Sequence, residues 1–409
     1  MGTVVALVLA AGCGDGDDGD GGGTADGGAS GAEGAVTIDL GPTDEASGES
    51  VRIGFISDGR NATTDQSVDF DVADATVAYL NTHRGGIAGR PIEIVPCEAQ
   101  LDPAVATDCA NRMVEEDVVA VVVGTTAEVE QVWEPLHQAG VPAMFFAAQG
   151  DAVLADAETT FGLGDPTAST VGVPISVAEA NDVDKVTVVV IDVPPAVAPY
   201  ESVGAAQFEE AGIDLEIVAI PPGTADMTAQ LTPILNADPG VVHVLGNDAF
   251  CIAAFQAMET VGFDGPVTSI PQCITDATRD AVPGAQLEGI TVGASSPVDA
   301  NDESDALYRT VMAEFGDGID TSRATGHGAF TAIAGLDAAL EELTGEVTRE
   351  TVLAAIRSMP ETELPNGGGL TFRCSGDLVP GYPAACVRGT LVTTLDAEGR
   401  PTTYEARQG

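Results

Sequence analysis

The chain has 409 residues, of which 44% are hydrophobic, and this length predicts two domains of ordinary size around separate cores. It carries 15 Lys and Arg against 64 Asp and Glu, a formal net charge of −49. A surface of this sign repels nucleic acid and anionic lipid headgroups. Because the acids are spread along the whole chain, we interpret them as a solubility adaptation, for example to high salt. No apolar run reaches the roughly 18 residues that a membrane-spanning helix needs.

The first residues are typical of an exported lipoprotein. Residues 3–11 form a short apolar run that ends at Gly12-Cys13, so we expect residues 1–12 to be a signal peptide. Small residues before a cysteine are typical of the bacterial site at which that cysteine takes a lipid. Residues 13–50 begin with a Gly- and Asp-rich stretch that cannot bury a core, which predicts a flexible tether. We therefore expect the protein outside the cytoplasm, anchored to the outer face of the cell membrane by a lipid on Cys13; the alternative is a clipped fragment with an inert cysteine.

Six further cysteines fall into local pairs, and the even number in an exported chain indicates disulfides. Their closeness in the sequence favours the sequential pairing. The residues are Cys97 with Cys109, Cys251 with Cys273, and Cys374 with Cys386. None forms a CxxC motif, and the four histidines (His83, His137, His243 and His327) lack metal-ligand spacing, so we expect no metal and no cofactor.

From residue 51 onward, strand and helix patterns alternate. Strands are expected at 51–57, 91–96, 118–123, 142–146 and 185–191, with helices at 68–81 and 103–116. The β-branched run at 118–123 is typical of a strand buried on both faces. This alternation predicts an α/β fold with parallel sheets flanked by helices.

Two stretches about 120 residues apart follow one βαβ plan and suggest two similar lobes. They are DVVAVVVGTTAEVEQVWEPLHQAGVPAMFF from Asp117 and PGVVHVLGNDAFCIAAFQAMETVGFDGPVTSI from Pro239. Further helices are expected at 303–315, 326–343 and 349–359, with short strands near 369–372 and 390–395. Since these helices have no sheet of their own, we expect them to return to the first lobe.

Ligands of open α/β sheets bind beyond the carboxyl ends of the strands, and polar or small residues follow several of the expected strands. The candidate ligand-binding residues are Asp58, Thr125, Thr126, Ala147, Ala148, Gln149, Asp192, Asn247, Asp248 and Gln272. Backbone N–H groups at a helix start, with a hydroxyl beside them, suit a carboxylate. The alternative is that Thr126 and Asp248 only cap their helices. Arg60 could hold a ligand carboxylate or pair with Asp58 and Asp65.

Catalytic motifs are absent from the sequence. It contains no GxSxG elbow, no Walker loop and no GxGxxG after a strand, so we expect no enzymatic activity. An exported hydrolase is the alternative, and it would require Ser57 or Ser269 beside a histidine.

Several stretches together resemble a known family. They are VRIGFIS, GGIAGRPIEIV, LDPAVATDCANRMVEEDVVAVVVG, QAGVPAMFF, VTVVVIDV and AMETVGFDGPV. Over residues 51–395 the chain resembles the branched-chain amino-acid type of periplasmic binding protein, the type I solute-binding proteins of ABC importers. PPGTADMT, HVLGNDAFC and GGGLTFRC are similar to lipoprotein members from high-GC actinobacteria.

The resemblance implies two Rossmann-like lobes, joined by three crossings, that close on a solute. We place the crossings near Gly164-Asp165, 295–299 and 365–369, which gives lobe one residues 51–165 plus 299–366. Lobe two takes residues 166–298 plus 367–405. The implied partner is an ABC permease in the cytoplasmic membrane. We expect this protein to be a monomer that binds no nucleic acid and contacts the membrane only through its N-terminal lipid.

The resemblance implies a branched-chain or related amino acid as ligand, but two glutamines depart from the family pattern. Gln149 stands where a hydroxyl is expected, and Gln272 stands near the position of the acid that pairs the ligand's ammonium. An amide cannot neutralise a buried charge, although Asp248 or Asp192 could take that role. A neutral amide, a urea-like compound or a small organic acid would also fit. A ligand sensor of the same fold is the alternative to a transport protein.

Overall fold

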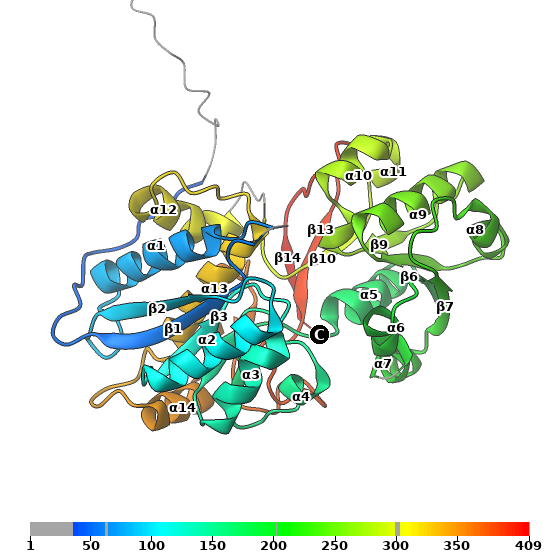
Figure 1. Cartoon of the computed structure of the whole chain (residues 1–409). Coiled ribbons are helices and arrows are strands. Elements are labelled where there is room, and N and C mark those ends of the chain that lie inside the picture. The colour runs from blue at the N-terminus through cyan, green and yellow to red at the C-terminus, as the bar shows by residue number, and fades with distance from the viewer. Residues whose placement is uncertain (1–35, 62–63, 202, 299–302, 409) are drawn as a thin grey trace, which may run out of the picture. The chain divides into compact units, whose positions relative to one another are not determined.

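The structure, a computed structural model, describes residues 36–61, 64–201, 203–298 and 303–408 (Figure 1). The expected signal peptide, Cys13, most of the tether, and Asp299 at the second expected crossing lie outside these residues. Two large sheets, of five and seven strands, carry helices on their faces, which confirms the α/β class. None of the described helices combines the length and apolar character that crossing a membrane requires.

The first sheet is parallel throughout, in the order β2-β1-β3-β4-β5. Its strands are β1 (Val51–Ser57), β2 (Ile92–Glu98), β3 (Ala120–Val123), β4 (Ala143–Phe145) and β5 (Thr160–Gly162). One face packs on α1 (Val68–His83), α12 (Ala306–Phe315), α13 (Ala324–Ala339) and α14 (Arg349–Ser358). The other face packs on α2 (Pro103–Glu115), α3 (Val129–Gln138) and α4 (Asp151–Leu154).

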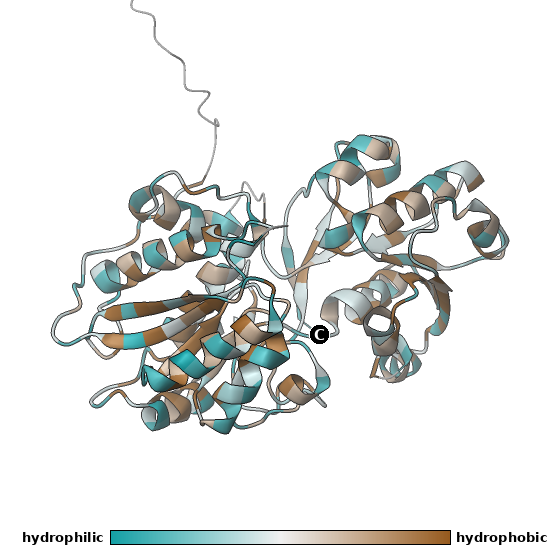
Figure 2. Cartoon of the chain, in the orientation of Figure 1, coloured by the Kyte–Doolittle hydropathy of each residue, from teal (hydrophilic) through white to brown (hydrophobic). Residues whose placement is uncertain are grey.

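Burial on both faces explains the unbroken apolar runs of this sheet. Phe55 packs into the core under α1 and α13, whereas its neighbour Ile56 packs into the core under α2 and α3. Figure 2 shows the result as brown strands beneath helices whose outer surfaces carry teal. Parallel sheets of this kind need a helical layer on each side, since neither face has polar residues to meet water.

Helix α13 is buried along nearly its whole length, and two glycines permit its close contacts. A Cβ at Gly326 would lie 2.7 Å from the Tyr308 hydroxyl, and one at Gly328 would lie 2.7 Å from a ring carbon of Phe146. A side chain at either position would push α13 away from α12 or from the residue that follows β4.

Two histidines serve packing. His327 Nε2 lies 3.0 Å from the Thr321 carbonyl, and burial lowers the pKa of His327 to about 4. His243 Nδ1 lies 2.8 Å from Thr268 Oγ1, and burial lowers its pKa to about 3. Both imidazole rings are therefore neutral at pH 7, and they pack in the core as uncharged side chains.

The second sheet has the order β14-β13-β10-β9-β8-β6-β7. Its parallel strands are β6 (Lys185–Ile191), β7 (Asp214–Ile220), β8 (Val241–Leu245), β9 (Val267–Ser269) and β10 (Thr291–Ala294), to which β13 (Thr390–Thr394) and β14 (Glu405–Arg407) add antiparallel pairings. One face packs on α8 (Thr228–Leu235), α9 (Asp248–Val261), α10 (Asp276–Ala281) and α11 (Gly284–Leu287). The other packs on α5 (Val173–Ala180), α6 (Pro194–Glu201) and α7 (Val203–Ala211).

After β10 the chain returns to the first sheet through α12, α13 and α14, and residues beyond 369 still contact that sheet. After the short pair β11 (Thr362–Glu363) and β12 (Thr371–Phe372), the Gly162 N–H of β5 donates to the Ala384 carbonyl at 2.7 Å, and the Cys386 N–H donates back to the Gly162 carbonyl at 2.8 Å. Residues 384–386 therefore lie beside β5, further along the chain than the crossing expected near 365–369. The chain joins the second sheet only at β13.

The described residues contain three disulfides, and each joins two consecutive cysteines of the chain, as the sequential pairing predicts. They link Cys97 to Cys109, Cys251 to Cys273, and Cys374 to Cys386. The first ties β2 to α2, and the third closes the loop that packs beside β5. Each bond therefore reinforces contacts within one local unit.

The carboxylate of Asp156 organises the turn between α4 and β5. It accepts hydrogen bonds from Thr160 Oγ1 at 2.6 Å, Thr159 Oγ1 at 2.7 Å and Trp133 Nε1 at 3.2 Å, and it lies 3.0 Å from His137 Nδ1. Burial alone would raise the pKa of Asp156, but these donors hold it well below its ordinary value.

We predict that Asp156→Ala lowers the free energy of unfolding by about 3 kcal/mol, because it leaves several buried donors without an acceptor. Denaturant unfolding at pH 7 measures this loss. Asp151→Ala, at an exposed position of α4, is the control and should change stability by about 0.5 kcal/mol or less. Equal effects of the two variants would contradict the role given to Asp156.

Candidate functional site

The carboxyl edge of the first sheet gathers most of the candidate residues of the first lobe. Because β1, β3 and β4 are parallel, the loops that follow them share this edge. Asp58 follows β1, Thr125 and Thr126 follow β3, and residues 147–149 follow β4. We describe this group as the first edge.

Asp58 ties the loop after β1 to the loop after β3. Its side chain is buried (2% exposed) and accepts hydrogen bonds from Thr126 Oγ1 at 2.8 Å and from the Ala127 N–H at 3.1 Å. The Asp58 N–H in turn donates to the Thr125 carbonyl at 2.8 Å. Thr126 Oγ1 also accepts from the Glu128 N–H at 3.1 Å, so this hydroxyl joins the two loops as well as closing its own turn.

A second carboxylate, Asp69 in the first turn of α1, lies behind the same loop. It is fully buried, and its Oδ2 accepts from Ser57 Oγ at 2.6 Å and from the Thr125 N–H at 3.4 Å. Burial raises the pKa of Asp69, and the hydrogen bond from Ser57 is the main opposing effect. Gly124 leaves room for this arrangement, since a Cβ there would lie 3.4 Å from Asp69 Oδ2 and 3.1 Å from the Phe55 ring.

Sequence reasoning missed Asp69. An acid in the first turn of a helix is ordinary, because it faces the positive end of the helix dipole. The one available signal was Ser57, a hydroxyl at the expected end of a buried strand, which needs an acceptor that the sequence alone does not identify.

The loop after β4 is open to solvent. Ala147 and Gln149 are exposed, and Ala148 packs against the core beneath α2 and α3. Gly150, at φ +92°, leads into α4, and a Cβ there would lie 2.8 Å from Glu130 Oε1. The Glu130 carboxylate therefore lies against this loop and adds a further negative charge to the first edge.

The carboxyl edge of the second sheet presents Asp192 after β6, Asn247 and Asp248 after β8, and Gln272 after β9. Asn247, rather than Asp248, caps α9: its Oδ1 accepts from the Phe250 N–H at 3.0 Å. The Asp248 carboxylate accepts only from the adjacent Ala249 N–H, at 2.8 Å, among the contacts described for it. Asp192 and Gln272 are exposed. The disulfide from Cys251 holds α9 against the turn that carries Gln272.

Thr126 is likewise not a helix cap, because α3 begins at Val129 and the residue before it, Glu128, makes no capping bond. Its hydroxyl is committed to Asp58 instead. The sequence left two roles open for Thr126, contact with a ligand or capping of the following helix, and the structure rules out the capping role.

Arg60 pairs with Asp65 and not with Asp58. Its guanidinium lies 2.8 Å from Asp65 Oδ2, on side chains that are 67% and 53% exposed. Hydrogen bonds from Ser67 and Arg60 lower the pKa of Asp65 to about 2. Arg323 Nη2 also donates to the Asp65 carbonyl at 2.7 Å, so both cations are engaged at this outer turn.

The serines that a hydrolase would need are bonded elsewhere. Ser57 Oγ donates to Asp69, and Ser269 Oγ donates to the Val244 carbonyl at 3.0 Å. No bond from either serine to a histidine occurs in the described part of the chain. Within the same residues, no group of three or more His, Cys, Asp or Glu side chains could hold a metal ion.

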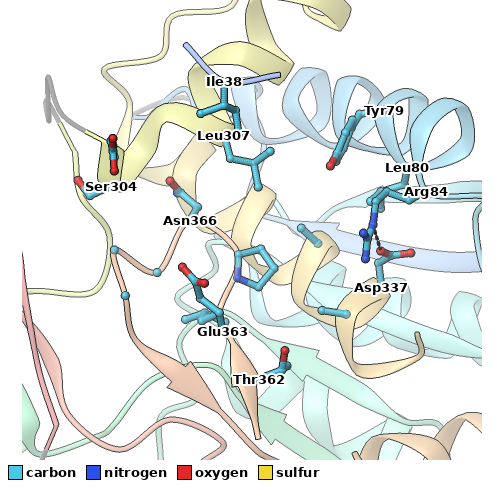
Figure 3. Close-up of a pocket in the computed structure, with 18 of the residues that line it drawn as sticks. Ile38, Tyr79, Leu80, Arg84, Ser304, Leu307, Asp337, Thr362, Glu363 and Asn366 are labelled. Carbon is cyan, nitrogen blue, oxygen red and sulfur yellow. Dashed lines mark ion pairs between the residues drawn. The ribbon is translucent and has the colours of Figure 1, made fainter. Parts of the chain in front are cut away.

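A cavity of about 810 Å³ lies at another part of the molecule (Figure 3). Its walls come from the C-terminal parts of α1 and α13 and from residues 362–369. Asn81 of α1 accepts from the Ile92 N–H at the start of β2, which places this end of the cavity at the amino edge of the sheet. Arg84 Nε lies 3.6 Å from Asp337 Oδ2 in its wall.

Comparison with known proteins gives one family and several structures. The sequence model of the periplasmic binding protein family matches residues 50–390. No curated protein sequence matches the chain.

The structural matches extend over nearly the whole of each neighbour. A Rhodospirillum rubrum protein assigned to branched-chain amino acid ABC transport is 17% identical, with a TM-score of 0.71, covering 87% of this chain and 99% of the other. Streptococcus pneumoniae LivJ, solved with isoleucine, is 16% identical with a TM-score of 0.63, covering 88% and 100%. A Rhodopseudomonas palustris solute-binding protein, solved with 4-hydroxybenzoate, is 16% identical with a TM-score of 0.64, covering 88% and 98%. At these identities the likeness concerns the fold.

We predict a pH dependence of stability that comes from Asp337. Burial raises the pKa of Asp337 from 3.8 to about 6, against the opposing effect of Arg84. A folded-state pKa above the unfolded value means that the folded chain holds this proton more tightly. The stabilisation is therefore complete below about pH 4 and is lost as the pH rises through about 6.

Asp337→Asn imitates the protonated form at every pH. Between about pH 4 and pH 7, the wild type should lose about 2 kcal/mol of unfolding free energy relative to this variant. Denaturant unfolding across that range measures the difference. Glu341→Gln, at a side chain 66% exposed that also pairs with Arg84, is the control and should track the wild type. A constant difference between the wild type and Asp337→Asn would contradict the prediction.

Proposed function

Because the chain belongs to the periplasmic binding protein family of ABC-transporter substrate-binding proteins, we propose that it binds a small polar solute between two lobes and delivers it to a membrane permease. The observation that carries this proposal is the matched pair of carboxyl edges. Each sheet ends in short polar loops that lead directly into helices, at Thr125–Thr126 in one and Asn247–Asp248 in the other. Loops at such edges are where open α/β sheets bind ligands.

We propose a clamp that catalyses no reaction. Asp58, Thr125, Thr126 and residues 147–149 would line one lobe, and Asp192, Asn247, Asp248 and Gln272 the other. Lobe one would comprise residues 51–165 with 299–387, because the loop closed by Cys374 and Cys386 bonds to β5. The remaining strands and helices would form lobe two.

The proposed location is the outer face of the cell membrane, where a lipid on Cys13 would hold the monomer near its permease. The Gly-rich sequence after Cys13 supports a tether of this kind. Three disulfides within local units also support an oxidising, extracytoplasmic compartment.

Membership of this family favours an amino acid ligand, whereas Gln149 and Gln272 favour a ligand with neutral hydrogen-bonding groups. Both glutamines are exposed at their edges and are free to turn either an amide oxygen or an amide nitrogen toward a solute. A thermal-shift screen of amino acids, amides, amines, polyols and small organic acids tests binding, since a ligand of the folded state raises the melting temperature by mass action.

Two neighbouring variants separate ligand contact from helix capping. Asp248→Ala should leave the melting temperature without ligand unchanged, because its carboxylate bonds only the adjacent N–H, and should reduce the shift caused by any screened ligand. Asn247→Ala should lower unliganded stability by about 1 kcal/mol, because it removes the cap of α9.

Asp280→Ala, at an exposed position of α10, is the matched control for loss of one charge. A ligand shift that is the same in Asp248→Ala, Asp280→Ala and the wild type would remove Asp248 from the proposed site. A full screen with no stabilising compound would count against solute binding itself.

A further inference from the structure

Two of the connections between the sheets contain a single residue that is not fixed by its neighbours. In the first connection, which follows β5, the Leu163 N–H donates to the Phe145 carbonyl of β4 at 2.9 Å, and Leu163 is buried in the core of the first sheet. Asp165 accepts hydrogen bonds from the turn that leads toward α5. Gly164 alone lies between these two anchored residues.

The last connection, which leads into β13, is equally short. Val387 is buried in the core of the first sheet and forms an antiparallel bridge with Phe372 of β12. Two residues later, the Gly389 N–H donates to Asp165 Oδ2 at 3.0 Å. Arg388, which is exposed, is therefore the one residue between a group held by the first sheet and a group held by Asp165.

The carboxylate of Asp165 joins these two connections. Its Oδ1 accepts from the N–H groups of Thr167 and Ala168, at 2.9 and 3.1 Å, and from Thr167 Oγ1 at 3.1 Å. Its Oδ2 accepts from the Gly389 N–H. One oxygen therefore closes the turn of the first connection, and the other binds the backbone of the last.

Further bonds fix the far side of both connections to the second sheet. Thr390 Oγ1 donates to the Ala294 carbonyl of β10 at 2.8 Å, so Ser169 Oγ, 3.0 Å away, is the donor of the bond between the two hydroxyls. Gly293 permits this close approach, because a Cβ there would lie 3.0 Å from the Cα of Ser169. The chain beyond either connection is therefore expected to move with the second sheet.

The middle connection, from β10 to α12, does not limit the motion in the same way. Residues 295–305 lie between these two elements, and a segment of this length follows a rotation without defining its axis. Packing between the two parts occurs close to the last connection: Leu391, two residues after Gly389, is buried in the core of the first sheet. Gly368 leaves room for it, since a Cβ there would lie 2.9 Å from Leu391 Cδ2.

We propose that Gly164 and Arg388 are the pivot on which the two sheets turn, and that Asp165 is the positioning residue that makes them act as one axis. The inference rests on the proposed solute-binding function, in which two lobes close on a solute, and it names the residues that control the closing. Such residues change affinity through the balance of open and closed forms, because a solute is held only by the fraction of molecules that can close.

Asp165→Asn separates the two tasks of this carboxylate. The amide oxygen can still accept from Thr167 and Ala168, whereas the amide nitrogen is a donor and cannot accept from the Gly389 N–H. The substitution therefore keeps the turn of the first connection and removes its bond to the last. The Gly389 amide should exchange its hydrogen at least about tenfold faster in this variant.

The spread of distances between the lobes is the decisive measurement. It is obtained by double electron–electron resonance on the full-length protein without added solute, with nitroxides carried by unnatural amino acids at the exposed positions Asp108 in α2 and Glu210 in α7. We expect Asp165→Asn to widen the distribution, because the two connections no longer turn together. An unchanged distribution despite faster exchange at Gly389 would overturn the inference.

Gly164→Ala tests the pivot in the opposite direction. The added Cβ has room, since the nearest atom outside the adjacent residues is the Phe146 carbonyl oxygen at 3.8 Å. The methyl group restricts the backbone torsions, so the distribution should narrow without loss of melting temperature. Gly172→Ala, at φ −64° with no atom within 4 Å of the new Cβ, is the matched control and should leave the distribution unchanged. Equal effects of the two variants would contradict the assignment of Gly164.

Arg388→Gly and Arg388→Ala remove the same charge, but only the glycine variant frees the backbone. We expect the wider distance distribution in Arg388→Gly; identical distributions in the two variants would place the pivot elsewhere and overturn the inference. All of these measurements are made without solute. A solute screen in which nothing binds therefore counts against the proposed function alone.

Discussion

The parallel pairing of β1 with β3 is the constraint on which the rest of the first lobe depends. It brings Ser57 and Asp58, at the end of one strand, beside the loop from Gly124 to Ala127 at the end of the other. Two buried carboxylates then bind that loop from beneath, through a hydroxyl and backbone N–H groups. The entrance of α3 therefore already holds a carboxylate of the protein, bonded to the Thr126 hydroxyl and to the Ala127 N–H.

The second edge is built from the same βαβ plan with different chemistry. At α9 the cap is an amide, Asn247, and the adjacent Asp248 keeps its carboxylate nearly free. At α3 no side chain caps the helix, and the acid comes from a distant strand. The two equivalent loops therefore differ in where their charges lie. At α9 the acceptor is Asn247, in the same loop, whereas at α3 the acceptor is Asp58, which is 68 residues earlier in the chain.

The fold was predictable because its signals are local. Continuous apolar strands such as β3 depend on a few neighbouring residues, and so does the start of α2, where Asp102 caps the helix just before Pro103. The position of residues 384–386 beside β5 was not predictable, since it depends on backbone bonds to a strand more than two hundred residues earlier. The same limit applied to Asp69, whose partner Ser57 lies on another element.

By itself, the sequence determined the class of the fold, the pairing of its cysteines on grounds of locality, and the loops that meet at the carboxyl edges. Residue type and spacing are enough for these, because hydrophobic periodicity and turn chemistry are short-range properties. Only the tertiary structure decided what each polar side chain at those edges is bonded to. Whether Thr126 offers its hydroxyl to a ligand or gives it to Asp58 depends on packing between segments that are far apart in the chain.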